Sequence, residues 1–153
     1  MDTVRTEKYL NDLLEKTYDA QRGYAYAAEV INHVQLKRWL AQQGARRTEF
    51  AAVLFREIKG MNNTPELDGS FTGDTHRGWM NIKAALSLHK DEAVPEECLT
   101  GEKYAIQEYH KVLEHNKEMP PSIISILEAQ KDEMQLTVNE ISSLADFAHD
   151  HHL

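Results

Sequence analysis

The chain has 153 residues, of which 41% are hydrophobic and 27% charged, a composition typical of one soluble globular domain with its own core. Its formal net charge of -8 argues against a nucleic-acid or anionic-membrane surface, because the summed field repels polyanions. Cys98 is the single cysteine, so no intramolecular disulfide is expected, and neither a signal peptide nor a membrane-spanning run is predicted. We therefore expect a cytoplasmic protein without nucleic-acid or membrane partners.

Two helices are predicted in the first part of the chain. Apolar residues recur every three or four positions from about Thr3 to Asn32 and again from Val34 to Lys59, which is the pattern of amphipathic helices. Gly60 is a natural stop for the second helix. Because only a few residues separate the two helices, we expect them to pack as an antiparallel hairpin.

A long connection follows the second helix. Its first part, 60-GMNNTPELDGSFTG-73, is loop-like, and 74-DTHRGWMNIKAALS-87 predicts a short capped helix. A bundle helix of about 25 residues is about 38 Å long at about 1.5 Å per residue, and the connection can span that length and return the chain to its starting end. One long crossover after the second helix is typical of the ferritin-like arrangement rather than of an up-down-up-down bundle.

The second half of the chain predicts another pair of helices. The third helix runs from about Glu96 to Asn116, entered through Pro95, and the fourth follows 120-PP-121. Strand patterning is nearly absent, so the fold class is all-α: a ferritin-like four-helix bundle whose long crossover carries a short extra helix between helices two and three. We take residues 1–148 as one bundle domain and 149–153 as a short His-rich C-terminal tail.

Several segments carry a resemblance to known families. The first helix is similar to the ferritin pattern at Asn11, Leu14, Ala20 and Tyr24, although Thr17 stands where a metal-binding glutamate is expected. More closely, the chain resembles a bacterial family of ferritin-like four-helix bundles known only as a domain of unknown function. The segments that carry this resemblance are 10-LNDLLEKTYDAQRGYAYAAE-29, 47-RTEFAAVL-54, 76-HRGWMNIKAAL-86 and 97-ECLTGEKYA-105. The resemblance implies a fold and no activity.

The ligands of a ferritin-like di-metal site are missing. Such a site takes a glutamate from each of two helices and Glu-x-x-His from each of the other two, and no Glu-x-x-His occurs in this chain. The nearest equivalents are Arg47 and Phe50 on the second helix and Gln135 and Val138 on the fourth. Glu102 alone remains as a carboxylate, and one carboxylate cannot hold two hard cations. We expect no metal, no cofactor and no iron oxidation.

Arg47 stands on the inward stripe of the second helix, where a bundle normally places an apolar side chain. An unpaired buried charge is very costly, and Glu102 lies on the inward stripe of the third helix, so we expect the two to pair where relatives bind metal. The predicted buried polar cluster consists of Arg47, Glu102, Gln21, Gln130, Thr17 and Tyr24. The alternative leaves the Arg47 stem along the core and its charged group in water. A buried pair would specify helix register more than it stabilises.

The preferred interpretation is a non-enzymatic ferritin-like bundle of unknown role. Two other classes stay open: a metal-binding or redox protein with an atypical site around Glu102, and a helical partner-binding module that uses residues 76–80. His76, Arg77 and Trp79 would form the partner surface of that module. A homodimer and metal binding by the C-terminal histidines are also left open.

Overall fold

A computed structural model of the chain describes residues 3–61, 81–88 and 90–150. These residues form helices, turns and short connections without any strand, which confirms the all-α prediction. The elements are α1 (Thr3–Val30), α2 (Val34–Gly60), a helical segment at 81–87, the short 3-10 helix η1 (Asp91–Ala93), α4 (Val94–His115) and α5 (Pro121–Asp150). The four long helices begin and end close to the bounds expected from their apolar periodicity.

Helices α1 and α2 form a hairpin, and side chains cap the two helix ends that meet at its turn. The His33 imidazole Nδ1 accepts a hydrogen bond from the Leu36 backbone N–H at 3.3 Å, and so satisfies one free donor at the start of α2. Lys37 Nζ donates to the backbone carbonyl of Ala28 at 2.5 Å and to that of Glu29 at 3.2 Å, which neutralises the negative end of α1. Residues 31–33 therefore join the two helices through reciprocal capping.

Helices α4 and α5 form the second hairpin. Pro95 and the acidic Glu96 and Glu97 occupy the first turn of α4, where a missing N–H and negative charges are both favourable. At the other end, Asn116 Nδ2 donates to the Val112 carbonyl at 2.9 Å, and residues 116–120 turn the chain into α5. Each helix packs mainly against its hairpin partner, and fewer close contacts link the two hairpins.

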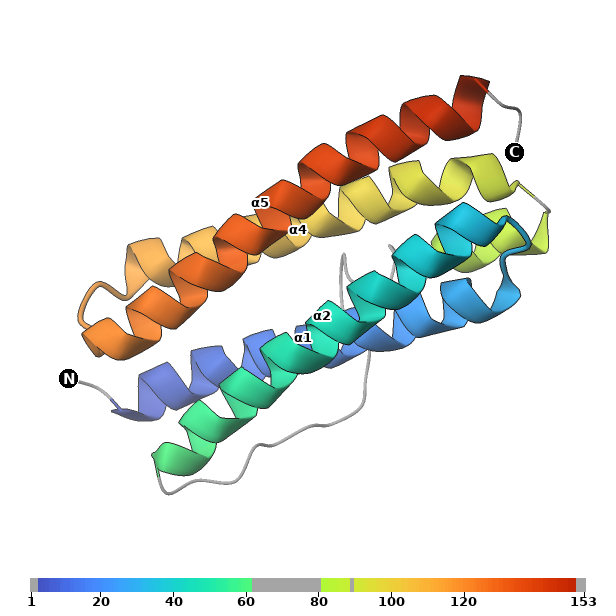
Figure 1. The fold of residues 1–153 in the computed structure, drawn as a ribbon. Coiled ribbons are helices and arrows are strands. Elements are labelled where there is room, and N and C mark those ends of the chain that lie inside the picture. Colours follow the sequence, from blue (N-terminus) through green and yellow to red (C-terminus); the bar gives the residue numbers. More distant parts are fainter. Residues whose placement is uncertain (1–2, 62–80, 89, 151–153) are drawn as a thin grey trace.

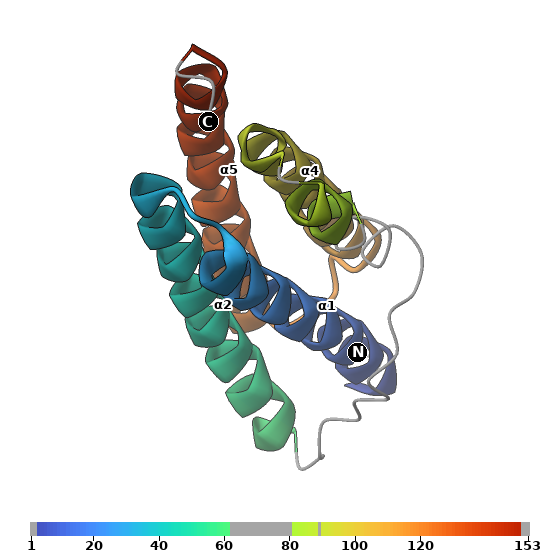
Figure 2. The ribbon, with the colours of Figure 1, turned by 90° about the vertical axis from the view of Figure 1, so that its right-hand side faces the viewer.

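The helix directions explain the long crossover. Figure 1 shows α1 and α5 running in one direction and α2 and α4 in the opposite direction, so α2 finishes at one end of the molecule and α4 starts at the other. The connection must therefore run the length of the helices. Its residues 62–80 lie outside the described residues, and so do positions 74–80 of the predicted short helix; positions 81–87 are helical. Figure 2, turned by a right angle, shows the α1–α2 hairpin beside the α4–α5 hairpin.

The hydrophobic core is divided into two clusters. The first contains Leu10, Leu13, Leu14, Phe50, Ala51, Leu54, Ile58, Tyr109, Val112, Met119, Ile123, Leu127 and Met134. The second contains Tyr24, Ala27, Ile31, Leu36, Leu40, Ile82, Ala85, Leu86, Val94, Cys98 and Ile141. All four long helices contribute to both clusters, and the segment 81–87 adds three residues to the second. The boundary between the clusters defines the candidate site.

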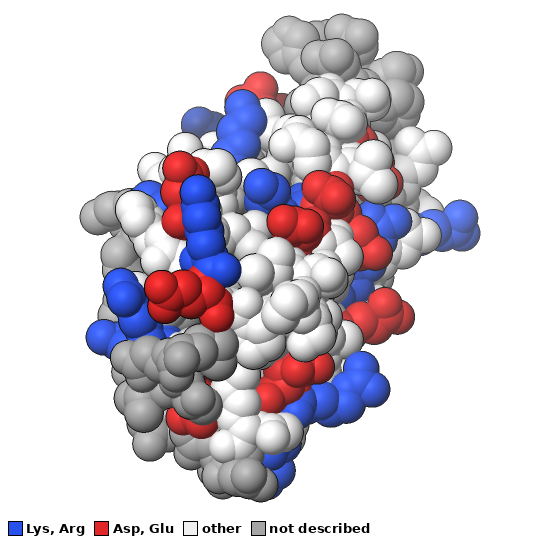
Figure 3. All heavy atoms as spheres, turned by 90° about the vertical axis from the view of Figure 1, so that its left-hand side faces the viewer, with Lys and Arg blue, Asp and Glu red and all other residues white. Residues whose placement is uncertain are grey.

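The surface shows no preference for one sign of charge on the face drawn in Figure 3, where basic and acidic side chains lie interspersed. A hollow of about 300 Å³ is lined by Arg5, Thr6 and residues 114–119, and it too mixes cations with carboxylates. No described helix is both long and apolar enough to cross a bilayer.

Candidate functional site

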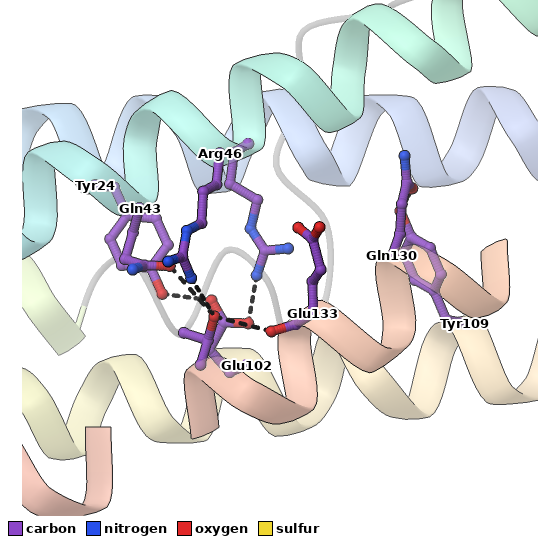
Figure 4. A network of polar contacts seen from close by, with 9 residues as sticks. Tyr24, Gln43, Arg46, Glu102, Tyr109, Gln130 and Glu133 are labelled. Atoms are coloured by element: carbon purple, nitrogen blue, oxygen red, sulfur yellow. Dashed lines mark hydrogen bonds and ion pairs between the residues drawn. The ribbon is translucent and has the colours of Figure 1, made fainter. Parts of the chain in front are cut away.

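A layer of buried polar side chains separates the two hydrophobic clusters. Between the cluster residues of each long helix stands at least one polar residue that is at most 6% exposed. These residues are Thr17 and Asp19 on α1, Gln43 and Arg47 on α2, Glu102 on α4, and Thr137 on α5. Buried polar groups need hydrogen-bond partners, so the layer restricts which helix registers are compatible with the fold. Figure 4 shows part of this polar layer.

Arg47 and Glu102 form an ion pair inside the layer. Arg47 Nη2 donates to Glu102 Oε2, and the two side chains are only 7% and 2% exposed. The guanidinium also lies over the Phe50 ring, 5.4 Å from its centroid. Burial alone would lower the pKa of Arg47, but the Glu102 carboxylate raises it, and the net shift is upward. The guanidinium therefore stays protonated, and the ion pair joins α2 of one hairpin to α4 of the other.

Tyr24 is the second partner of Glu102. Its hydroxyl donates to Glu102 Oε1 at 2.5 Å, so each carboxylate oxygen accepts a bond from a different helix. Burial and the nearby Glu102 carboxylate hold the pKa of Tyr24 well above its usual value, which keeps the phenol protonated as a donor. Tyr24 faces α2 at Gly44, where a Cβ would lie 3.7 Å from that of Tyr24, an ordinary van der Waals contact.

A separate bridge lies further along the helices. The Tyr109 hydroxyl donates to Gln130 Oε1 at 2.6 Å, and Gln130 Nε2 donates to the Phe50 carbonyl at 3.3 Å. Burial raises the pKa of Tyr109 to about 12. In Figure 4 this pair lies apart from Glu102, along the helix axes. Gln130 is therefore buried, as the sequence indicates, but its bonds join α4 and α5 to the α2 backbone rather than to the ion pair.

Two other predicted members of the cluster bond elsewhere. Thr17 is buried and donates to the Leu13 carbonyl of its own helix at 2.7 Å. Gln21 is half-buried and donates to Thr48 Oγ1 at 2.8 Å, across the outer groove between α1 and α2. The structure thus brings Arg47, Glu102 and Tyr24 together, and it directs the bonds of Thr17, Gln21 and Gln130 to other groups.

Polar residues outside the predicted cluster complete the layer. Gln43 Oε1 accepts a bond from the Thr137 hydroxyl at 3.4 Å, while Gln43 Nε2 meets no acceptor among the described residues. Arg46 Nη1 lies 3.5 Å from Thr137 Oγ1 and 3.7 Å from Glu140 Oε1, which links α2 to α5. The signal was present: Gln43 and Thr137 are polar residues on otherwise apolar stripes. Their hydrogen-bond partners on the facing helix could not be read from spacing.

The chemistry available in the layer is limited. Both oxygens of Glu102 are occupied, and the Arg47 cation stands beside them, so a metal ion would have to displace a charged partner. Burial and the neighbouring Glu102 raise the pKa of Cys98, which leaves the thiol protonated and unreactive. In the described part of the chain, no three His, Cys, Asp or Glu side chains gather closely enough to hold a metal. His76, Arg77 and Trp79 of the proposed partner surface lie outside the described residues.

Comparison with known proteins identifies the family. Residues 5–115 match the model of a domain of unknown function, DUF2383, which is well over half of the chain. The chain belongs to the DUF2383 family. The matched region contains Tyr24, Arg47 and Glu102, whereas α5 with Gln130 and Thr137 follows it. No curated protein matches the chain, and no solved structure matches it. The sequence resemblance to a domain of unknown function is therefore confirmed, and DUF2383 membership supplies no activity.

Proposed function

We propose that this DUF2383 protein is a non-enzymatic helical module of the ferritin-like arrangement, in which an Arg47–Glu102–Tyr24 cluster occupies the layer that holds metals in that fold. The four long helices, their directions and the single long crossover support this arrangement. In the proposal, the cluster holds the two hairpins in one register, and the protein acts as a stable structural module.

One observation carries the proposal: both oxygens of a carboxylate that is 2% exposed are bonded by groups from two other helices. Shifting α4 by one turn would separate Glu102 from Arg47 and Tyr24 and leave an uncompensated charge in the core. Removing one member of a buried ion pair is strongly destabilising, whereas replacing both members by apolar residues is often nearly neutral. The cluster therefore favours one register over the others more than it adds net stability.

A double-mutant cycle tests the architectural role. We expect Arg47→Met and Glu102→Leu each to lower the free energy of unfolding by about 3–5 kcal/mol, and the double variant to lower it by much less than the sum. Urea unfolding followed by circular dichroism measures these values. Arg46→Met is the matched control; because Arg46 is 41% exposed, its variant should cost only about 0–1 kcal/mol. If Arg47→Met costs no more than this control, the proposal is wrong.

A metal titration separates the proposal from its main competitor, an atypical metal site around Glu102. Untagged protein is mixed with iron(II) or manganese(II), and bound metal is measured after desalting. The occupied Glu102 oxygens predict no stoichiometric binding that depends on this residue. About one or two equivalents per chain in the wild type, lost in Glu102→Gln, would establish the metal-binding function instead.

A further inference from the structure

Tyr24 and Trp39 are in contact, and each donates a hydrogen bond to a carboxylate. The rings of Tyr24 and Trp39 meet edge to face, with centroids 6.0 Å apart and planes at 79°. Trp39 Nε1 donates to Glu140 Oε2 at 3.1 Å, and the Tyr24 hydroxyl donates to Glu102 Oε1 at 2.5 Å. Trp39 is half-buried, whereas Tyr24 is 2% exposed. The two rings in contact therefore lead from Trp39, which water can reach, to Tyr24 in the interior polar layer.

The carboxylate beside Tyr24 determines which buried phenol can be oxidised. A phenol that loses one electron must also lose its proton, because its radical cation is a very strong acid. In the interior only a hydrogen-bonded base can take this proton. Tyr24 has such a base in Glu102, whereas the equally buried Tyr109 donates to the amide oxygen of Gln130, which is far too weak a base. The two tyrosines thus form a matched pair that differs in its proton acceptor.

We propose that Trp39 and Tyr24 form a one-electron relay that ends in a neutral tyrosyl radical at Tyr24. A diffusible one-electron oxidant of the peroxyl or carbonate radical class takes an electron from Trp39 and is itself reduced by one electron. Tyr24 returns an electron to Trp39 as its phenolic O–H bond breaks, and the proton forms a new O–H bond with Glu102 Oε1. The module would in this way trap an oxidising equivalent inside the bundle.

Arg47 makes the trap reversible. Its charge opposes protonation of Glu102, because the guanidinium loses its anionic partner when the proton arrives. When a reductant returns the electron, the proton moves back to Tyr24 and the ion pair is restored. The relay goes beyond the architectural role proposed above: radical formation needs only the contacts among Trp39, Tyr24 and Glu102, and Arg47 acts only in its reversal.

Photo-oxidation of the full-length protein tests the relay. A ruthenium polypyridyl complex with a sacrificial cobalt amine acceptor oxidises the protein after a laser flash, and transient absorbance and freeze-quench electron paramagnetic resonance detect tyrosyl radicals. The exposed Tyr26 and Tyr104, each 40% exposed, supply a short-lived background because their radicals can couple with one another in solution. We expect an additional long-lived tyrosyl signal in the wild type.

The variants give opposite expectations for the two buried tyrosines. Tyr24→Phe should remove the long-lived signal and leave the background, whereas Tyr109→Phe should retain the signal at wild-type yield. Trp39→Phe should slow its appearance, and solvent deuteration should slow it as well, since the proton moves with the electron. Both tyrosine variants lose only a hydroxyl group, and their helical circular dichroism is checked first. A long-lived signal that survives in Tyr24→Phe, or an appearance rate unchanged in Trp39→Phe, would overturn the relay.

Discussion

Tyr24 and Tyr109 place two phenols in the interior, and their ionisation links stability to alkaline pH. Burial raises the pKa of Tyr109 to about 12 and that of Tyr24 well above its usual value. The unfolded chain releases both protons as pH rises through about 10, while the folded protein retains them. Because the folded state then binds more protons, its stability is fully present below pH ~10 and is lost progressively above it.

The predicted slope is measurable. Each buried phenol should reduce the free energy of unfolding by up to about 1.4 kcal/mol per pH unit, over a window that extends to about pH 12 for Tyr109. Urea unfolding at successive pH values gives this slope. Tyr109→Phe should make it shallower, and Tyr104→Phe, which changes an exposed tyrosine, should leave it as in the wild type. An equal slope in wild type and Tyr109→Phe would show that this hydroxyl is accessible to water.

At the scale of one hairpin, Gly44 lies on α2 where that helix packs against α1. A methyl group added there would lie 3.7 Å from Tyr24 Cβ and 3.8 Å from the Ala25 backbone nitrogen, which is ordinary van der Waals contact. Alanine is favoured over glycine in a helix by about 0.8–1.0 kcal/mol, so Gly44→Ala should stabilise the protein by up to about 1 kcal/mol. A leucine at the same place should cost about 1–3 kcal/mol through overpacking.

Denaturant unfolding checks this pair of substitutions, and Gly101→Ala serves as the control. Gly101 lies on α4 with open space around it, so alanine should give the helix-propensity gain there without any packing change. A loss of more than about 1 kcal/mol in Gly44→Ala, with Gly101→Ala unchanged or stabilised, would mean that the α1–α2 contact tolerates no added carbon.

Single helices were the most predictable elements of this chain. Apolar periodicity located α1, α2, α4 and α5 to within a few residues, because each helix buries one face. The same periodicity favoured Arg47 as the inward residue, and in the structure Arg47 is buried whereas Arg46 is half-exposed. One residue corresponds to about 100° of rotation, so a small drift of the stripe would have made Arg46 or Thr48 the inward residue. The bonds of individual amides were not predictable: whether Gln21 reaches Thr48 depends on how α2 sits against α1. Positions 76–79 lie outside the described residues, so the partner surface stays a prediction.

For the whole molecule, the contact between the hairpins consists of more than apolar packing. Besides the central cluster, Lys16 on α1 forms an ion pair with Glu108 on α4 at 2.8 Å. Glu140 on α5 accepts a hydrogen bond from Trp39 of α2 and lies 3.7 Å from Arg46 of the same helix. Surface pairs of this kind contribute little individually. Together with the buried bonds they restrict sliding of one hairpin on the other, while the two apolar clusters supply most of the free energy.

Helix α5 lies beyond the region that matches the family model, and yet it completes both clusters. Leu127 and Met134 belong to the first cluster and Ile141 to the second, and each is at most 2% exposed. Without α5, the apolar stripe of α4 and the inner side of α2 would face water, at a cost of about 25 cal/mol for every Å² of apolar surface exposed.

A chain that stops after residue 118 should therefore lose its cooperative thermal transition and bind a hydrophobic dye. A chain that stops after residue 150 is the control and should melt as the wild type does. A sharp transition in the shorter chain would show that residues 5–115 fold alone and that α5 is an addition to a self-sufficient core.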